Sequence, residues 1–233
     1  LVLNLGQKYK FEHDKIHEAS YSRIATSDQE MMHYDLAHIL LRRATTKEMR
    51  QLHLFDITGH MNSAIRLISN PDERLEILQL NCDAGIQAKE SNAYDSALVF
   101  LSIADKMLSD DYWATNYNLA NLVRFHLAEC FYLLNKVEEG HRVIDETIKR
   151  LNNDDEKAQY LHLRMQKLVN LGEYVKGIDF AIEALGVLGI KMARNPSPLH
   201  VLKALFRLKT RIGRRNVDFL LSIPECTDKK HLL

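Results

Sequence analysis

Two histidines and an aspartate near the start of the chain are the residues whose types and spacing could do chemistry. His13 and Asp14 open an expected helix, and His17 follows one turn later. Backbone N–H groups at a helix start attract anions, so an imidazole at this place could contact a phosphate. His13 and His17 could instead bind a metal, but zinc catalysis needs three protein ligands, and no nearby group completes a convincing set. The simplest alternative is that His13 and Asp14 only cap the helix.

The motifs of common catalytic sites are absent from the sequence. It contains no G-x-x-x-x-G-K-[ST], no G-x-S-x-G and no H-E-x-x-H. Without the first of these nothing cradles a triphosphate, so we expect this segment to be non-catalytic, with no cofactor and no metal of its own. Cys82, Cys130 and Cys226 lie far apart and form no Cys-x-x-Cys pair. Such an odd, scattered set is typical of reduced thiols in a cytoplasmic protein.

The composition indicates a helical protein. Only nine glycines and four prolines occur in 233 residues, which is few for a protein made of many tight turns. Basic and acidic residues number 31 each, so the formal net charge is zero and general nucleic-acid binding is disfavoured. No apolar run is long enough to span a membrane. Both ends of the sequence resemble truncation points, so we interpret the chain as a fragment.

Helical periodicity begins after a short extended segment. Residues 1–11 alternate apolar and polar around Gly6 and predict a strand or hairpin. Thr46 is placed to cap a long helix, and Asn70 with Pro71 ends that helix and starts the next. Residues 113–134 are expected to form the longest helix.

Small residues recur at fixed separations from residue 75 onward and predict closely crossing helix pairs. Gly85 and Ala97 occupy the small positions of one helical hairpin. Ala128 and Gly140 have the same separation in a second hairpin, and Gly177 lies in a third, weaker unit. A bulky side chain at such a crossing would overpack it, at a cost of about 1–3 kcal/mol.

The fold expected from these patterns is all-α. It is a right-handed superhelical stack of hairpins of the tetratricopeptide type, because single hairpins cannot bury both apolar faces and must stack. A short winged-helix remnant is expected at the N-terminus. We divide the chain into this remnant (1–26), connecting helices (27–70), helical repeats (71–190), and a basic helix with the start of a further segment (191–233).

The basic helix expected over residues 199–212 carries apolar residues on one face and only basic charges. It could cover the end of the repeats, dock onto an acidic face of a neighbouring domain, or contact a membrane surface or nucleic acid. Its possible docking residues are Lys203, Arg207, Lys209, Arg211, Arg214 and Arg215.

Four separated segments resemble one family. They are Phe11-x-His13-Asp14-x-Ile16-x-x-Ala19-x-Tyr21, Leu54-Phe55-Asp56-Ile57-x-x-His60-Met61-Asn62, a segment from Leu80 to Ala97, and Leu221-x-Ile223-Pro224-Glu225-x-Thr227-Asp228. In this order they are similar to the region after the winged-helix domain of large bacterial signalling proteins with a predicted AAA/STAND ATPase core. Many members of that family also carry a Ser/Thr kinase domain, GAF domains, and a histidine kinase or nucleotide cyclase.

The resemblance implies a role for this segment inside a larger protein. His13 would approach the β-phosphate of ADP, and Asp14 would position the loop or cap the helix. The parent protein would then be an ATP-binding kinase with ATP or ADP as cofactor. This segment would be its regulatory, protein-interacting arm, with the ATPase and kinase domains and an unknown protein or small molecule as partners. The main alternative is a free-standing tetratricopeptide-type adaptor for one protein partner, and an enzyme with an unrecognised helical active site ranks third.

Overall fold

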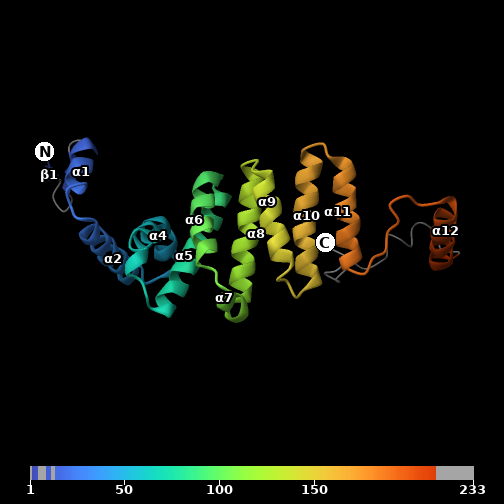
Figure 1. Cartoon of the computed structure of the whole chain (residues 1–233), viewed down its shortest axis with the longest axis horizontal. Helices are drawn as coiled ribbons and strands as arrows, with labels where there is room; N and C mark the ends of the chain where they lie inside the picture. Colours follow the sequence, from blue (N-terminus) through green and yellow to red (C-terminus); the bar gives the residue numbers. More distant parts are fainter. Residues whose placement is uncertain (1, 5–8, 12–13, 214–233) are drawn as a thin grey trace. The chain divides into compact units, whose positions relative to one another are not determined.

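The computed structural model describes residues 2–4, 9–11 and 14–213, and it divides into two compact units, residues 1–130 and 131–233 (Figure 1). The described residues form twelve α-helices, one 3-10 turn and two short strands. The predicted fold class, an all-α stack of helical hairpins, is confirmed. The right-handed superhelical sense of the stack stays a prediction.

A small strand pair precedes the first helix. Strands β1 (Val2–Asn4) and β2 (Tyr9–Phe11) are antiparallel, with Val2 opposite Phe11. Helix α1 (Asp14–Tyr21) is the next described element. Extended segments were predicted here, whereas Gly6, the expected turn residue, lies outside the described residues. The assignment of residues 1–26 to a winged-helix domain stays a prediction.

The connecting helices form the first packed layer of unit 1. Helix α2 (Thr26–Arg43) packs against α4 (Leu54–Ser63), with α3 (Lys47–Leu52) between them in sequence. Thr46 caps α3 as predicted, since its hydroxyl accepts the Met49 amide hydrogen at 3.2 Å. The single long helix expected after Thr46 is wrong. His53 and Ala64 leave ideal helical geometry and divide the segment into α3, α4 and the 3-10 turn η1 (Ile65–Leu67).

The helix pair α5 (Pro71–Glu90) and α6 (Tyr94–Met107) completes this layer. Asn70 caps α5 through its side-chain oxygen, and Pro71 occupies the first turn, as predicted. One apolar core joins these helices across the predicted boundary at residue 70. It contains Ala37, Ala44, Ile57, Met61, Ile68, Ile77, Leu78, Cys82, Ala104, Met107 and Val123.

A buried amide pair fixes how α4 meets α5. The side-chain amides of Asn62 and Asn81 each donate to the other's oxygen at 2.8 Å. Asn81 is fully buried and also donates to the carbonyl of Ile77 at 3.0 Å. Satisfied polar groups in a core specify one register, because any slip would leave them unpaired.

Three-residue turns join two more helix pairs, as one does between α5 and α6. The pairs are α8 (Tyr117–Leu133) with α9 (Val137–Ile148), and α10 (Asp154–Asn170) with α11 (Tyr174–Val187). The middle residue of each turn has positive φ: Asn92 at 61°, Asn135 at 58° and Gly172 at 79°. The amide after it donates five residues back at 2.8–2.9 Å, from Ala93 to Ala88, Lys136 to Phe131, and Glu173 to Leu168. This is the Schellman motif, and only glycine and asparagine adopt its left-handed residue readily.

Among the described residues the longest helix is α5, with 20 residues, and not the predicted segment 113–134. That segment is broken at Asn116 into α7 (Asp110–Thr115) and α8. Thr115 donates to the carbonyl of Asp111, and Asn116 donates to the Thr115 hydroxyl at 3.0 Å. Threonine and asparagine compete with helical hydrogen bonding in this way, which explains the break.

Unit 2 contains α9, α10, α11 and α12 (Pro198–Ile212). Arg164 of α10 joins α9, donating to the carbonyl of His141 at 2.8 Å and to Asp145 at 2.6 Å. Its guanidinium also lies over the ring of Phe180 on α11, 4.9 Å from the centroid. One buried cation therefore connects three helices.

We expect Gly140→Ala to destabilise the protein by about 1–3 kcal/mol, because a methyl group there would meet the Tyr132 ring. The added methyl group would lie only 2.6 Å from Cδ1 of this ring, and a hydrogen bond between the Tyr132 hydroxyl and Nδ1 of His141 holds the ring in place. Urea unfolding followed by circular dichroism measures the change.

The matched control is Gly186→Ala on α11, where a methyl group meets nothing within 4 Å. This change should be neutral or stabilising by about 0.5–1 kcal/mol, because alanine favours a helix more than glycine does. Equal unfolding free energies for the two variants would show that the α9 position is not tightly packed.

Candidate functional site

The residues predicted to sense nucleotide fall at the edge of the described structure. His13 lies outside the described residues. Asp14 is the first residue of α1, but its side chain is not among those described. The nucleotide contact therefore stays a prediction.

The five predicted packing residues lie inside the hairpin helices. Gly85 on α5 faces Leu101, whose Cγ would lie 2.5 Å from an added methyl group, and Ala97 on α6 is fully buried. Ala128 is buried on α8, and Gly140 is buried on α9 against Tyr132. Gly177 on α11 lies against Val169, 3.1 Å from an added methyl group. These positions are sites of close helix approach and present no groups to a ligand.

The predicted docking residues lie on or after α12. Lys203, Arg207 and Lys209 are exposed on this helix. Arg211 belongs to α12, but its side chain is not described, and Arg214 and Arg215 lie outside the described residues.

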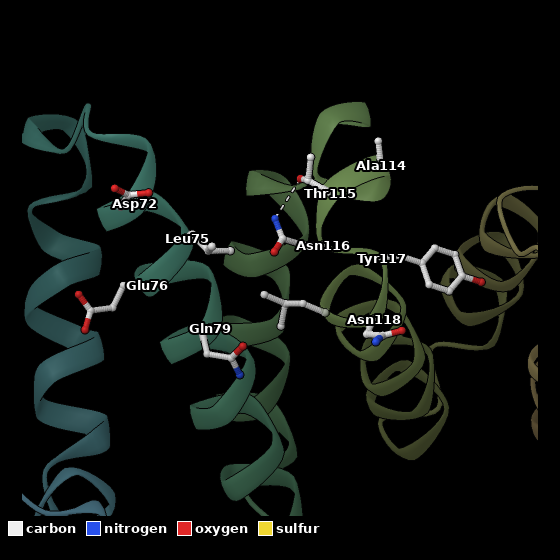
Figure 2. A pocket seen from close by; sticks show the side chains of 10 residues that line it. Asp72, Leu75, Glu76, Gln79, Ala114, Thr115, Asn116, Tyr117 and Asn118 are labelled. Carbon is white, nitrogen blue, oxygen red and sulfur yellow. Dashed lines mark hydrogen bonds between the residues drawn. The ribbon is translucent and has the colours of Figure 1, made fainter.

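Unit 1 contains an open cleft of about 680 Å³ that was not predicted from the sequence (Figure 2). It lies between α5 and the junction of α7 with α8. Figure 2 shows Leu75 and Gln79 directed from α5 toward this junction, whereas Glu76 and the Tyr117 ring point away from it. The lining residues are Asp72, Leu75, Glu76, Gln79, Ala114, Thr115, Asn116, Tyr117, Asn118 and Leu119.

The residues that line the cleft are better suited to binding a peptide than to catalysing a reaction. Gln79 donates one amide hydrogen to Asp83 at 2.8 Å, and Asn116 donates one to the Thr115 hydroxyl at 3.0 Å. Their oxygens and second hydrogens, with the amide of Asn118, match the needs of a peptide backbone. Leu75 and Leu119 add apolar surface beside them. The break at Thr115–Asn116 opens this cleft, and the poor helix propensity of these two residues was the available sequence signal.

A charged cluster joins the first helices of successive hairpins in unit 1. Lys89 on α5 contacts Glu129 on α8 at 2.5 Å and His126 at 2.9 Å, and His126 lies 2.8 Å from Glu129. Burial raises the pKa of Glu129, but hydrogen bonds from His126 and Lys89 and the charge of Lys89 outweigh it. The net effect holds the Glu129 pKa below its usual value. Glu129 is thus committed to a structural contact.

Two histidines and a tyrosine connect α1 to the connecting helices. The Nδ1 atoms of His33 on α2 and His60 on α4 lie 2.7 Å apart, and the Tyr21 hydroxyl lies 2.7 Å from Nε2 of His33. One imidazole must donate and the other accept, so both rings cannot be protonated without losing this bond. Burial, and then the neighbouring His33, lowers the pKa of His60, with Asp56 opposing.

No group of three or more His, Cys, Asp or Glu side chains in residues 14–213 is arranged to hold a metal ion. No helix in the described part of the chain has the length and apolar character needed to cross a membrane.

We expect acid to destabilise the protein partly through His60. Its pKa is lower in the folded state, so the unfolded chain binds the proton more readily below the ordinary histidine pKa of about 6.5. The stability from this site is present above that pH and is lost as the pH falls. His60→Asn keeps a hydrogen-bonding amide near His33 but does not titrate, so its unfolding free energy should fall less between about pH 7 and about pH 5.

Urea unfolding at several pH values measures this dependence. Some dependence should remain in the variant, because burial and the charge of Arg164 also lower the pKa of His141 in unit 2. An identical pH slope for His60→Asn and the unmodified chain would contradict the role of His60.

Comparison with known proteins gives one informative similarity. No protein-family model and no solved structure matches the chain. The chain is 21% identical over 238 aligned residues to hybrid signal transduction histidine kinase G of Dictyostelium discoideum. The alignment covers 92% of this chain but only 7% of that protein, so the chain spans a small part of its relative's length. The similarity favours a signalling-related role, while the tetratricopeptide and STAND assignments and a bacterial origin stay predictions.

Proposed function

We propose that this chain is the non-catalytic regulatory and protein-binding arm of a large signal-transduction ATPase-kinase. The observation that carries the proposal is the similarity to a hybrid signal transduction histidine kinase along 92% of the chain. The all-α hairpins agree with a non-catalytic role for their packing residues, because the small residues buried in the hairpins pack helices together and present no reactive groups. Cys82 and Cys130 are buried free thiols, which suits the cytoplasm.

The cleft between α5 and the α7–α8 junction is the proposed site for a partner peptide. Its amides and leucines can bind an extended segment through main-chain hydrogen bonds and apolar contacts. For such binding to regulate the parent, the partner must bind one conformation of the arm more tightly than another. The cleft lies at the start of α8, where the Asn116 break separates two helices that could change their angle.

The proposed route to the nucleotide passes through α1. Tyr21 at the end of α1 contacts His33, and His33 contacts His60 on α4, so α1 is tied to the arm. Gln29 strengthens this joint by donating to the carbonyls of Tyr21 and Ile24 at 2.9 and 3.1 Å. Asp14 is the first residue of α1, and His13 precedes it in the sequence. In the parent, His13 would bind the β-phosphate of ADP and Asp14 would position the loop. A movement of the arm would thereby alter nucleotide retention and the kinase or cyclase output.

We expect His13→Ala in the full-length parent protein to release bound ADP about 10- to 100-fold faster. A charge-assisted hydrogen bond to a phosphate contributes about 1.5–3 kcal/mol, and the substitution removes it. The measurement is the loss of prebound ADP into excess unlabelled nucleotide, together with the basal phosphorylation rate.

The matched control is His162→Ala, an exposed histidine on α10 that is distant in sequence from the proposed contact. It should retain ADP as the unmodified parent does. If His13→Ala left both ADP retention and basal phosphorylation unchanged, the nucleotide-sensing role would be wrong. A parent protein without any nucleotide-binding domain would favour the adaptor alternative instead.

A further inference from the structure

Helix α12 carries an exposed apolar face that the described residues do not cover. Leu199, Leu202 and Phe206 are 76%, 64% and 68% exposed. The other exposed apolar residues of this helix are Val201, Leu205 and Leu208. Soluble surfaces rarely present a contiguous patch of this kind unless it binds something.

The helix has clear local start and stop signals but little else to stabilise it. Pro198 occupies its first turn, and the Ser197 hydroxyl lies 2.7 Å from Nδ1 of His200. Gly213, with φ of 63°, ends it. Isolated helices of about 15 residues are marginal in water, because nucleation costs more than the few hydrogen bonds return. A surface that covers the apolar face would therefore stabilise α12 as well as bind it.

The stretch of sequence that contains α12 carries only basic charge, although Arg194 in this stretch pairs with Asp179 at 2.8 Å. Between Glu183 and Asp218 the sequence contains no acidic residue. The basic residues of this interval are Lys191, Arg194, Lys203, Arg207, Lys209, Arg211, Arg214 and Arg215. The complementary surface must be anionic as well as apolar.

The positions of the two residue types match a bilayer interface. Positions 203, 207 and 211 follow at four-residue steps and share one stripe, while the apolar positions occupy about half of the helix circumference opposite. Lys209 lies within the apolar face, where its hydrocarbon stem can lie among acyl chains while its ammonium reaches the headgroups. A broad face of leucines with one phenylalanine, opposite Lys and Arg, is typical of helices that lie in the membrane interface. Clusters of four to eight basic residues on such helices bind anionic lipids.

We propose that α12 binds the surface of anionic phospholipid bilayers as a peripheral helix. Its leucines and phenylalanine would enter the boundary between headgroups and acyl chains, and its lysines and arginines would contact lipid phosphates. This binding does not depend on the regulatory role proposed above, and its measurement needs no kinase activity.

The test is cosedimentation of the 233-residue chain with vesicles of phosphatidylcholine alone or mixed with phosphatidylserine. We expect binding to the mixed vesicles, weak binding to the neutral ones, and a rise in helical circular dichroism on binding. Lys203→Gln with Arg207→Gln should weaken partitioning about thirtyfold at low salt. Each basic residue near an anionic surface strengthens binding about fivefold, and this variant loses two of them. Leu205→Gln with Phe206→Gln should weaken it at least about tenfold, because buried apolar surface is lost.

Two control variants make changes of the same kind elsewhere in the chain. Arg42→Gln with Arg43→Gln removes two exposed charges from α2, and Val175→Gln changes a 66% exposed apolar residue on α11. Both should bind vesicles as the unmodified chain does. Because all substituted side chains are exposed, the circular dichroism of each free variant should remain that of a folded chain.

Several outcomes would overturn the proposal. These are no binding of the folded chain to phosphatidylserine vesicles, equal loss of binding in the controls, or binding that survives Leu205→Gln with Phe206→Gln. Binding to poly-glutamate without binding to vesicles would also overturn it, since that result assigns α12 to an acidic protein surface.

Discussion

The left-handed residue in each helix-to-helix turn is the constraint on which the hairpins depend. Asn92, Asn135 and Gly172 reverse the chain within three residues and in the same conformation. Each reversal sets the second helix close against the end of the first, so a residue a short way into the second helix has little room. Ala97, Gly140 and Gly177 occupy that place, each five positions after its turn residue. The tight turn therefore requires the small side chain, because a larger residue at this place would overpack the helix crossing.

Polar contacts between packed helices add specificity to apolar packing. The Asn62–Asn81 pair, the Lys89–Glu129 contact and the Arg164–Asp145 contact each join helices that are not partners in one hairpin. Apolar side chains tolerate small slips, whereas a hydrogen-bonded pair does not, because a slip would leave a desolvated group unpaired. In the proposed regulatory arm, such contacts would favour discrete arrangements and would pass a change at one helix to the next.

Much of the fold was predictable, and the errors have identifiable causes. Asn70 with Pro71 and Thr46 were assigned correctly as helix starts, because capping depends on residues only two or three positions apart. The breaks at His53 and Asn116 were missed, because apolar periodicity continues across both and hides a change in helix direction. The cleft beside Asn116 was missed for the same reason, since a continuous helix over residues 113–134 would not have formed it.

By itself, the sequence determined most of the helices, the small packing positions and the amphipathic, acid-free character of α12. All of these follow from residues within a few positions of one another, and local propensity and periodicity act over that range. Only the tertiary structure decided that His33 meets His60, that Lys89 meets Glu129, and that α5 and the α7–α8 junction enclose a cleft. These contacts join residues 27 to 40 positions apart, and they depend on how whole helices pack, which no short-range pattern records.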